Sequence, residues 1–115
     1  MRRGDIVAVS LDPVRGSEAD KTRPAVVVSN DAANTAATRL GRGVITVVPV
    51  TSSVARVYPF QVLLLASQTG LSRDSKAQAE QVRSVAVERI GRILGRLPGS
   101  VMTEVEQALR VHLDL

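Results

Sequence analysis

The chain of 115 residues has no cysteine and one histidine, His112. Without cysteine it can form neither disulfides nor thiolate metal sites, and a single histidine excludes a metal site built from several imidazoles. We therefore expect no metal and no cofactor. His112 falls in a predicted terminal helix, where we expect it to have a structural or surface role.

Long hydrophobic runs are also missing. The longest uncharged stretch, residues 57–72, contains Pro59 and Gly70, and it is too short and too polar to span a bilayer. Residues 1–5 are not followed by the apolar run that a signal peptide requires. We expect a soluble protein of the cytoplasm with no membrane attachment.

Aromatic residues are scarce, whereas arginine is abundant. Tyr58 and Phe60 are the only residues of the Phe, Trp and Tyr types, which is few for a platform that stacks single strands. The 15 basic residues exceed the 11 acidic ones, giving a net charge of +4, and all but Lys21 and Lys76 are arginine. Arginine binds phosphate through two parallel hydrogen bonds, and a basic chain favours an acidic partner such as nucleic acid or an acidic protein segment. A GC-rich genome would produce the same arginine bias.

The composition, with 44% apolar and 23% charged residues, predicts one folded domain over residues 1–115. Residues 60–65 are apolar enough for a strand buried on both faces. Helices are predicted at two places, 32–38 after an N-cap at Asn30 and Asp31, and 101–113. Together these elements indicate a small, mostly β barrel with helical additions. The expected strands are 5–11, 24–29, 44–50, 60–65, 75–79 and 81–88, with 90–97 as strand or loop.

Two polar segments could support chemistry on phosphate. Residues 12–22 form a long predicted loop that ends directly before Arg23, and Thr51 begins a cluster of hydroxyl residues after a strand. Cleaving RNA without a metal requires that the ribose 2′-OH lose a proton, that the 5′-oxygen gain one, and that charge on the phosphate be balanced. With one histidine available, arginine must balance that charge. A solvated loop with weak ion pairs and an ordinary turn would explain the same residues.

Eight segments taken in order resemble the MazF/PemK family over about residues 2–113. Each is short and unspecific alone, but the order and spacing are specific. The segments are 3–7 (RGDIV), 11–13 (LDP), 16–18 (GSE), 21–31 (KTRPAVVVSND), 48–52 (VPVTS), 58–60 (YPF), 74–75 (DS) and 79–84 (AEQVRS).

The resemblance implies a toxin of a type II toxin–antitoxin pair. Such proteins are sequence-specific, metal-independent endoribonucleases that cleave single-stranded RNA, and the resemblance leaves open whether mRNA, rRNA or tRNA is the main target. The implied fold is the SH3-like β-barrel of the CcdB/MazF type, and the implied products are a 2′,3′-cyclic phosphate and a 5′-OH. The implied partners are a second copy in a homodimer and a MazE-like antitoxin with an acidic segment over the RNA groove. There are two alternatives: a CcdB-like gyrase poison of the same fold, without nuclease activity, and a catalytically inactive paralogue that binds RNA or has a regulatory role.

Site residues follow from the matched motifs. The resemblance makes Arg23 the leading catalytic residue and Thr51 its partner, and it implicates Glu18 in catalysis or in positioning the loop. The same match assigns a second set of residues to RNA binding: Ser17, Lys21, Ser52, Ser75 and Gln81.

Overall fold

The structure, a computed structural model, describes residues 1–11 and 22–115 of the chain. These ranges contain seven strands, three α-helices and two 3₁₀ turns. Their order is β1 (Asp5–Ser10), β2 (Thr22–Val27), α1 (Asp31–Leu40), β3 (Val44–Thr51), β4 (Gln61–Leu64), α2 (Ala66–Thr69), β5 (Ser75–Gln78), η1 (Ala79–Gln81), β6 (Arg83–Ala86), η2 (Val87–Arg89), β7 (Ile90–Arg96) and α3 (Gly99–Leu113).

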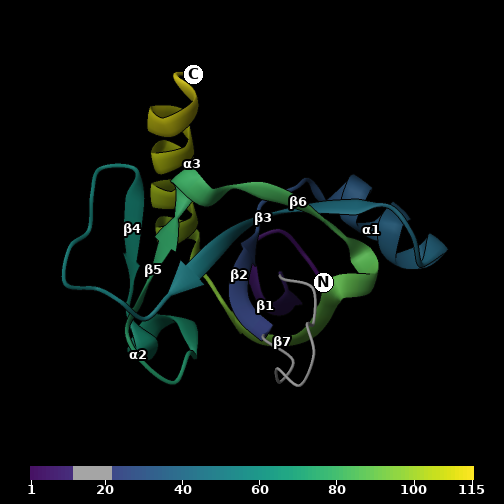
Figure 1. Ribbon diagram of the computed structural model, residues 1–115, viewed down its shortest axis with the longest axis horizontal. Helices are drawn as coiled ribbons and strands as arrows, with labels where there is room; N and C mark the ends of the chain where they lie inside the picture. The colour runs from purple at the N-terminus through teal and green to yellow at the C-terminus, as the bar shows by residue number, and fades with distance from the viewer. Residues whose placement is uncertain (12–21) are drawn as a thin grey trace, which may run out of the picture.

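The strands form one antiparallel sheet in the order β4-β5-β3-β2-β1-β7, and β6 also pairs with β3. Strand β3 pairs with three neighbouring strands. Its residues 44–47 pair with β6, residues 47–49 with β2 and residues 50–51 with β5. In Figure 1 the sheet curls on the side of α1, while α3 stands against β4 and η1 on the other side. This confirms the expected mainly β fold, a small SH3-like barrel with short helical insertions and a C-terminal helix.

Strand β1 and the parts of β2 and β3 that pair with each other are buried on both faces. Successive side chains of a strand point to opposite faces, and here both sets are apolar. Val26 and Val48 belong to one buried cluster, and their neighbours Val27 and Val47 belong to another. The first cluster includes the buried face of α3, which consists of Val101, Met102, Val105 and Ala108. The second cluster includes Ala37 of α1.

Strand β4 is half-buried, so the expectation that residues 60–65 are covered on both faces is wrong. Val62 and Leu64 face the core, whereas Leu63 between them is 43% exposed. The reason is that helix α3 covers only one face of β4: Val62 and Leu64 share a buried cluster with α3, whereas Leu63 on the opposite face belongs to neither buried cluster.

The expected strand over residues 81–88 is also wrong in its extent. Strands β5 and β6 both pair with β3, but in different registers. Between Val47 and Val50 strand β3 advances by three residues, whereas the paired chain takes six, from Arg83 back to Ala77. The surplus residues coil into η1, which leaves only Arg83–Ala86 as strand.

Other elements agree with the expected ones to within a few residues. Asn30 caps α1 as expected, with its side-chain Oδ1 accepting from the backbone N–H of Ala33 at 2.9 Å. Residues 90–97 are strand β7, and His112 lies exposed in the last turn of α3. Among the helices of the described ranges, none is long and apolar enough to cross a membrane.

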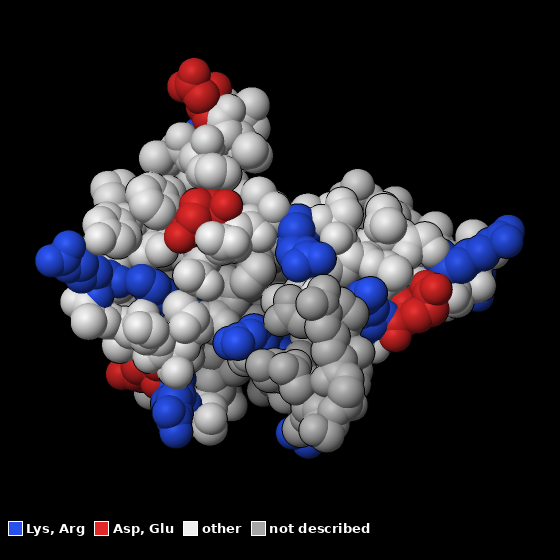
Figure 2. All heavy atoms as spheres, in the orientation of Figure 1, with Lys and Arg blue, Asp and Glu red and all other residues white. Residues whose placement is uncertain are grey.

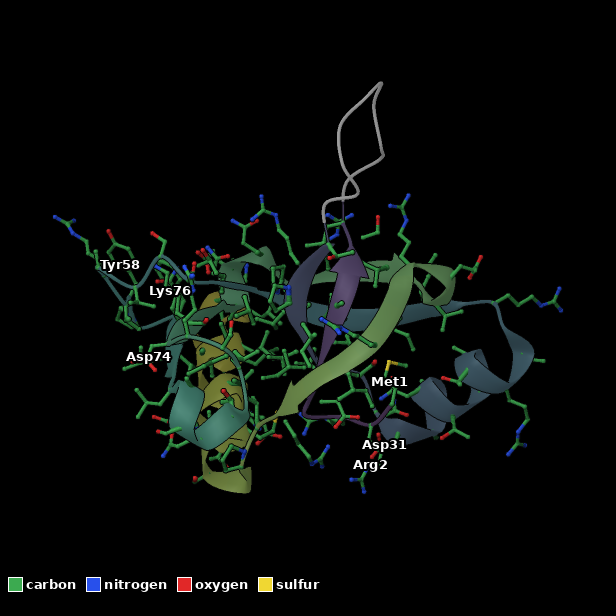
Figure 3. All side chains as sticks on the ribbon, turned by 90° about the horizontal axis from the view of Figure 1, so that it is seen from below. Met1, Arg2, Asp31, Tyr58, Asp74 and Lys76 are labelled. Atoms are coloured by element: carbon green, nitrogen blue, oxygen red, sulfur yellow. The ribbon has the colours of Figure 1, made fainter. Side chains whose placement is uncertain are left out.

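Asp31 ties the N-terminal segment to the start of α1. Its Oδ1 accepts from the backbone N–H of Arg3 at 2.7 Å and from Nδ2 of Asn34 at 3.3 Å. The bond from Arg3 is the main reason that the pKa of Asp31 lies below its ordinary value of 3.8, with Asn34 and the nearby charge of Arg2 adding to it. Figure 3 shows Arg2 and Asp31 next to each other.

A pH dependence of stability follows from this lowered pKa. The carboxylate of Asp31 stabilises the folded chain fully above pH 3.8, and this stabilisation is lost as the pH falls through the lower folded-state pKa. We expect Asp31→Asn to lower the urea midpoint at pH 7 and to have a smaller effect at pH 3. Urea unfolding of both proteins at the two pH values measures this. An equal difference at both values would show that the charge of Asp31 contributes nothing.

Candidate active site

The ladder between β2 and β3 stops early, next to two prolines. It joins residues 25–27 to 47–49 and ends at the pair Ala25–Pro49. Proline has no N–H, so neither Pro24 nor Pro49 can donate to a ladder. Beyond this pair β3 continues with Val50 and Thr51, which pair with β5 instead. The ends of β2 and β3 are therefore not joined to each other.

Pro24 also corrects the expected start of β2. The sequence predicts a strand from residue 24, but β2 begins at Thr22 and Pro24 is its third residue. Pro24 pairs with Ala8 of β1, and the ladder to β3 begins only at Ala25, so the missing N–H interrupts no bond of that ladder. Arg23 thus extends from a strand and not from the loop before it.

Arg23 and Thr51 project from the same face of the sheet. Side chains alternate along a strand, so Arg23 shares its face with Ala25, and Thr51 shares its face with Pro49. Ala25 and Pro49 are directly paired. Arg23 and Thr51 each lie two residues beyond this last pair, where β2 and β3 are no longer joined. The guanidinium of Arg23 and the hydroxyl of Thr51 therefore border the same gap between the two strand ends, which we call the opening.

Two cavities meet at this opening, and Arg23 and Thr51 line both of them. The first has a volume of about 270 Å³, and the second of about 250 Å³. Polar side chains complete each cavity: Ser52, Arg73 and Ser75 line the first, and Gln78, Gln81 and Arg83 line the second.

The charge at this opening is positive. Arg23, Arg73 and Arg83 contribute guanidinium groups, and none of the described residues that line the two cavities carries a carboxylate. Figure 2 shows basic side chains gathered near the centre of the face on which β2 and β3 lie in Figure 1. Guanidinium groups match a phosphodiester in charge and in hydrogen-bond geometry. The opening is suited to hold a phosphate of a nucleic acid backbone.

Thr51 is held in position by the turn that follows it. Its Oγ1 accepts a hydrogen bond of 3.2 Å from the backbone N–H of Ser53, and the residue is half-buried. A hydroxyl has one hydrogen to donate and two lone pairs. Since one lone pair serves Ser53, the hydrogen can be donated to a phosphate oxygen. Ser75 is buried, and its hydroxyl donates to the backbone carbonyl of Arg73 at 3.0 Å, which orders the neighbouring wall.

Five of the eight site residues predicted from the sequence come together here, from four separate segments of the chain. They are Arg23, Thr51, Ser52, Ser75 and Gln81. The other three, Ser17, Glu18 and Lys21, lie outside the described residues. Within the described ranges, no three histidine, aspartate or glutamate side chains gather as a metal site would require.

Sequence reasoning missed Arg73, Arg83 and Gln78, which line the same cavities. A signal existed for Arg83, because it lies within the matched segment 79–84. Nothing local distinguishes Arg73 from any other arginine in a turn, since only the packing of the turn against β2 and β3 brings it to the opening.

The whole chain matches known toxins in sequence. Residues 2–113 match the family model described as PemK-like, MazF-like toxin of type II toxin-antitoxin system. The endoribonuclease MazF9 of Mycobacterium tuberculosis is 65% identical over 115 residues, which cover 100% of this chain and 98% of that protein. The endoribonuclease EndoA of Bacillus subtilis is 32% identical over 116 residues, covering 100% of this chain and 96% of that protein.

Solved structures match over the same length. MazF of Deinococcus radiodurans has a TM-score of 0.75 and 29% identity, with coverage of 100% of this chain and 97% of that one. A MazE–MazF structure from the same organism has a TM-score of 0.75 and 30% identity, again with coverage of 100% and 97%.

Proposed function

Since the chain belongs to the family of PemK-like, MazF-like toxins of type II toxin-antitoxin systems, we propose that its Arg23–Thr51 opening is the site at which it cleaves single-stranded RNA. The chain is an endoribonuclease, the activity that its relatives MazF9 and EndoA are named for. Cleavage of mRNA, and of rRNA or tRNA where these are accessible, stops translation and growth. Translation takes place in the cytoplasm, so we infer that the toxin acts there.

The observation that supports this site most is the convergence of Arg23 and Thr51 from two strands whose ladder ends beside them. In the proposed reaction the 2′-oxygen attacks the neighbouring phosphorus and the bond from phosphorus to the 5′-oxygen breaks. The 2′-OH loses its proton, the 5′-oxygen gains one, and the products are a 2′,3′-cyclic phosphate and a 5′-OH. Arg23 balances the charge that develops on the phosphate, and Thr51 donates a hydrogen bond to it.

The remaining predicted residues have supporting roles in this proposal. Glu18 acts as a base or positions its loop. The RNA strand on either side of the scissile phosphate is bound by Ser17, Lys21, Ser52, Ser75 and Gln81, and we add Arg73 and Arg83 to this group.

Two partners belong to the proposal, and residues 1–115 act in it as one toxin domain. We propose that the chain works as a homodimer. We also propose that an acidic segment of a cognate MazE-like antitoxin binds the basic opening and competes with RNA there. The net charge of +4 and the three guanidinium groups of the opening support an acidic competitor.

A cleavage assay tests the function. Purified protein is incubated with a long RNA in the presence of EDTA, and the products are mapped by their ends. We expect cuts at discrete sites. Intact RNA would contradict the proposal and would favour the gyrase-binding alternative, which the match to endoribonuclease toxins does not support.

Replacing Thr51 tests the second member of the pair. We expect Thr51→Ala to lower the single-turnover cleavage rate by about 10- to 100-fold, because a neutral hydroxyl stabilises a phosphate less than a charged donor does. Thr35→Ala on the exposed side of α1 is the matched control and should cleave at the rate of the unmodified protein. A full cleavage rate for Thr51→Ala would remove Thr51 from the reaction.

A further inference from the structure

An aromatic pair lies in the segment between β3 and β4. The rings of Tyr58 and Phe60 are stacked, with centroids 5.4 Å apart and planes inclined by 9°. Phe60 is half-buried, whereas Tyr58 remains 43% exposed. The proposed cleavage reaction makes no use of this exposed ring.

Lys76 holds this segment in place. Only 8% of Lys76 is exposed, which is unusual for lysine, and its Nζ donates to the backbone carbonyl of Arg56 at 2.7 Å. The same Nζ lies 6.0 Å from the centroid of the Tyr58 ring, and Nη1 of Arg56 donates to the Tyr58 hydroxyl at 3.4 Å. A buried ammonium must keep its hydrogen bonds, because losing them is costly. The Tyr58 ring is therefore held in position although it is exposed.

Lys76 also links the ring to the active site. It is paired directly with Thr51 across the ladder between β3 and β5. Directly paired residues of an antiparallel ladder project from the same face, and neighbouring strands lie about 4.8 Å apart. One residue, Lys76, therefore connects the Tyr58 ring to the strand position next to Thr51. Figure 3 shows Tyr58 and Lys76 side by side, at the end of the molecule away from Met1 and Asp31.

We propose that Tyr58 stacks on one base of the RNA strand, close to the phosphate bound at Arg23 and Thr51. The base extends the Tyr58–Phe60 stack, and Arg56 and Lys76 supply positive charge beside it. Two aromatic residues are too few for a platform that follows a long strand, but one exposed ring is enough for one base. The proposal rests on the proposed function, since it requires RNA in the neighbouring opening.

Intrinsic fluorescence reports directly on this ring, because the chain has one tyrosine and no tryptophan. The probe is a short RNA that spans a mapped cleavage site and carries a 2′-deoxy nucleotide at the scissile position. We expect its binding to quench the Tyr58 emission. A series of the same RNA with one abasic nucleotide at each position in turn should lose the quenching at one position only. Quenching that is absent, or unchanged throughout the abasic series, would overturn the proposal.

Substitutions supply the second measurement. We expect Tyr58→Ala to weaken binding of the uncleavable RNA by about tenfold, as loss of one base–aromatic stack does. Tyr58→Phe keeps the ring and should bind within about twofold of the unmodified protein. Leu40→Ala on α1, where the side chain is 65% exposed, is the control for loss of an exposed apolar group. With the RNA that is abasic at the stacked position, Tyr58→Ala and the unmodified protein should bind equally.

The two proposals fail in different ways. If the unmodified protein cuts RNA but Tyr58→Ala binds it normally, or loses the same affinity for every abasic RNA, the stacking site is wrong and the cleavage site stands. If the unmodified protein cuts no RNA, the proposed function itself is wrong. Thermal melts show whether each variant is folded. The quenching series uses only the unmodified protein, so its result does not depend on the folding of any variant.

Discussion

Arg23→Ala is expected to lower the single-turnover rate of RNA cleavage by at least 100- to 1000-fold. Removing one preorganised donor to a developing oxyanion typically has an effect of this size. Arg23 extends from β2 at the opening shared with Thr51, so its guanidinium is aimed by a strand that is paired to β1. The side chain is exposed and belongs to neither buried cluster, so the variant should keep its fold.

Two further variants sharpen this result. Arg23→Lys should restore only part of the rate, because an ammonium cannot form the two parallel hydrogen bonds of a guanidinium. Arg42→Ala, in the exposed turn after α1, removes the same charge far from the opening and should cleave normally. Circular dichroism and thermal melts accompany the kinetics. A full rate with Arg23→Ala would falsify the assignment, and a loss of rate together with a loss of fold would assign Arg23 a structural role.

Cleavage should fall below detection when the scissile nucleotide of the RNA carries 2′-H in place of 2′-OH. The proposed reaction uses the 2′-oxygen as its nucleophile, so removing it leaves no internal group to attack the phosphorus. The matched controls are RNAs with the same change at each neighbouring nucleotide. These should still be cut, with smaller effects where a 2′-OH contributes to binding.

The products provide an independent check on this chemistry. Fragments of the unmodified RNA should end in a 2′,3′-cyclic phosphate, and their partners should begin with a 5′-OH that a kinase can label without prior phosphatase treatment. Cleavage of the 2′-deoxy substrate at the same site would instead require water as the nucleophile, and the roles proposed for Arg23 and Thr51 would then have to be assigned again.

Features that depend on neighbouring residues could be predicted from the sequence. The cap of α1 at Asn30 and the left-handed Gly41 at its end are local signals, with φ of 66° at Gly41. Most strands follow from short apolar runs between turn residues. The motif that contains Arg23 and the one that contains Thr51 could be singled out because their order along the chain is specific. Each of these features depends on residues that are close together in the sequence, so it can be predicted without knowledge of the fold.

Features that depend on which segments pair could be seen only in the folded chain. The apolar runs of β3 and β4 look alike, yet β3 contributes to both buried clusters, whereas β4 contributes only to the cluster that contains α3 and its Leu63 is exposed. In the sequence Lys76 looks like an ordinary surface lysine. In the folded chain it is paired with Thr51, and its Nζ donates to the backbone carbonyl of Arg56.

The site itself divides in the same way. Its residue types could be identified from the sequence, but the two cavities lie where the ladder between β2 and β3 ends, at Ala25 and Pro49, and that register is a property of the fold. Arg73 and Arg83 reach the opening from later segments of the chain. Strand register and the packing of distant turns place these side chains, and both are settled by the burial of apolar surface across the whole fold and not by any local pattern.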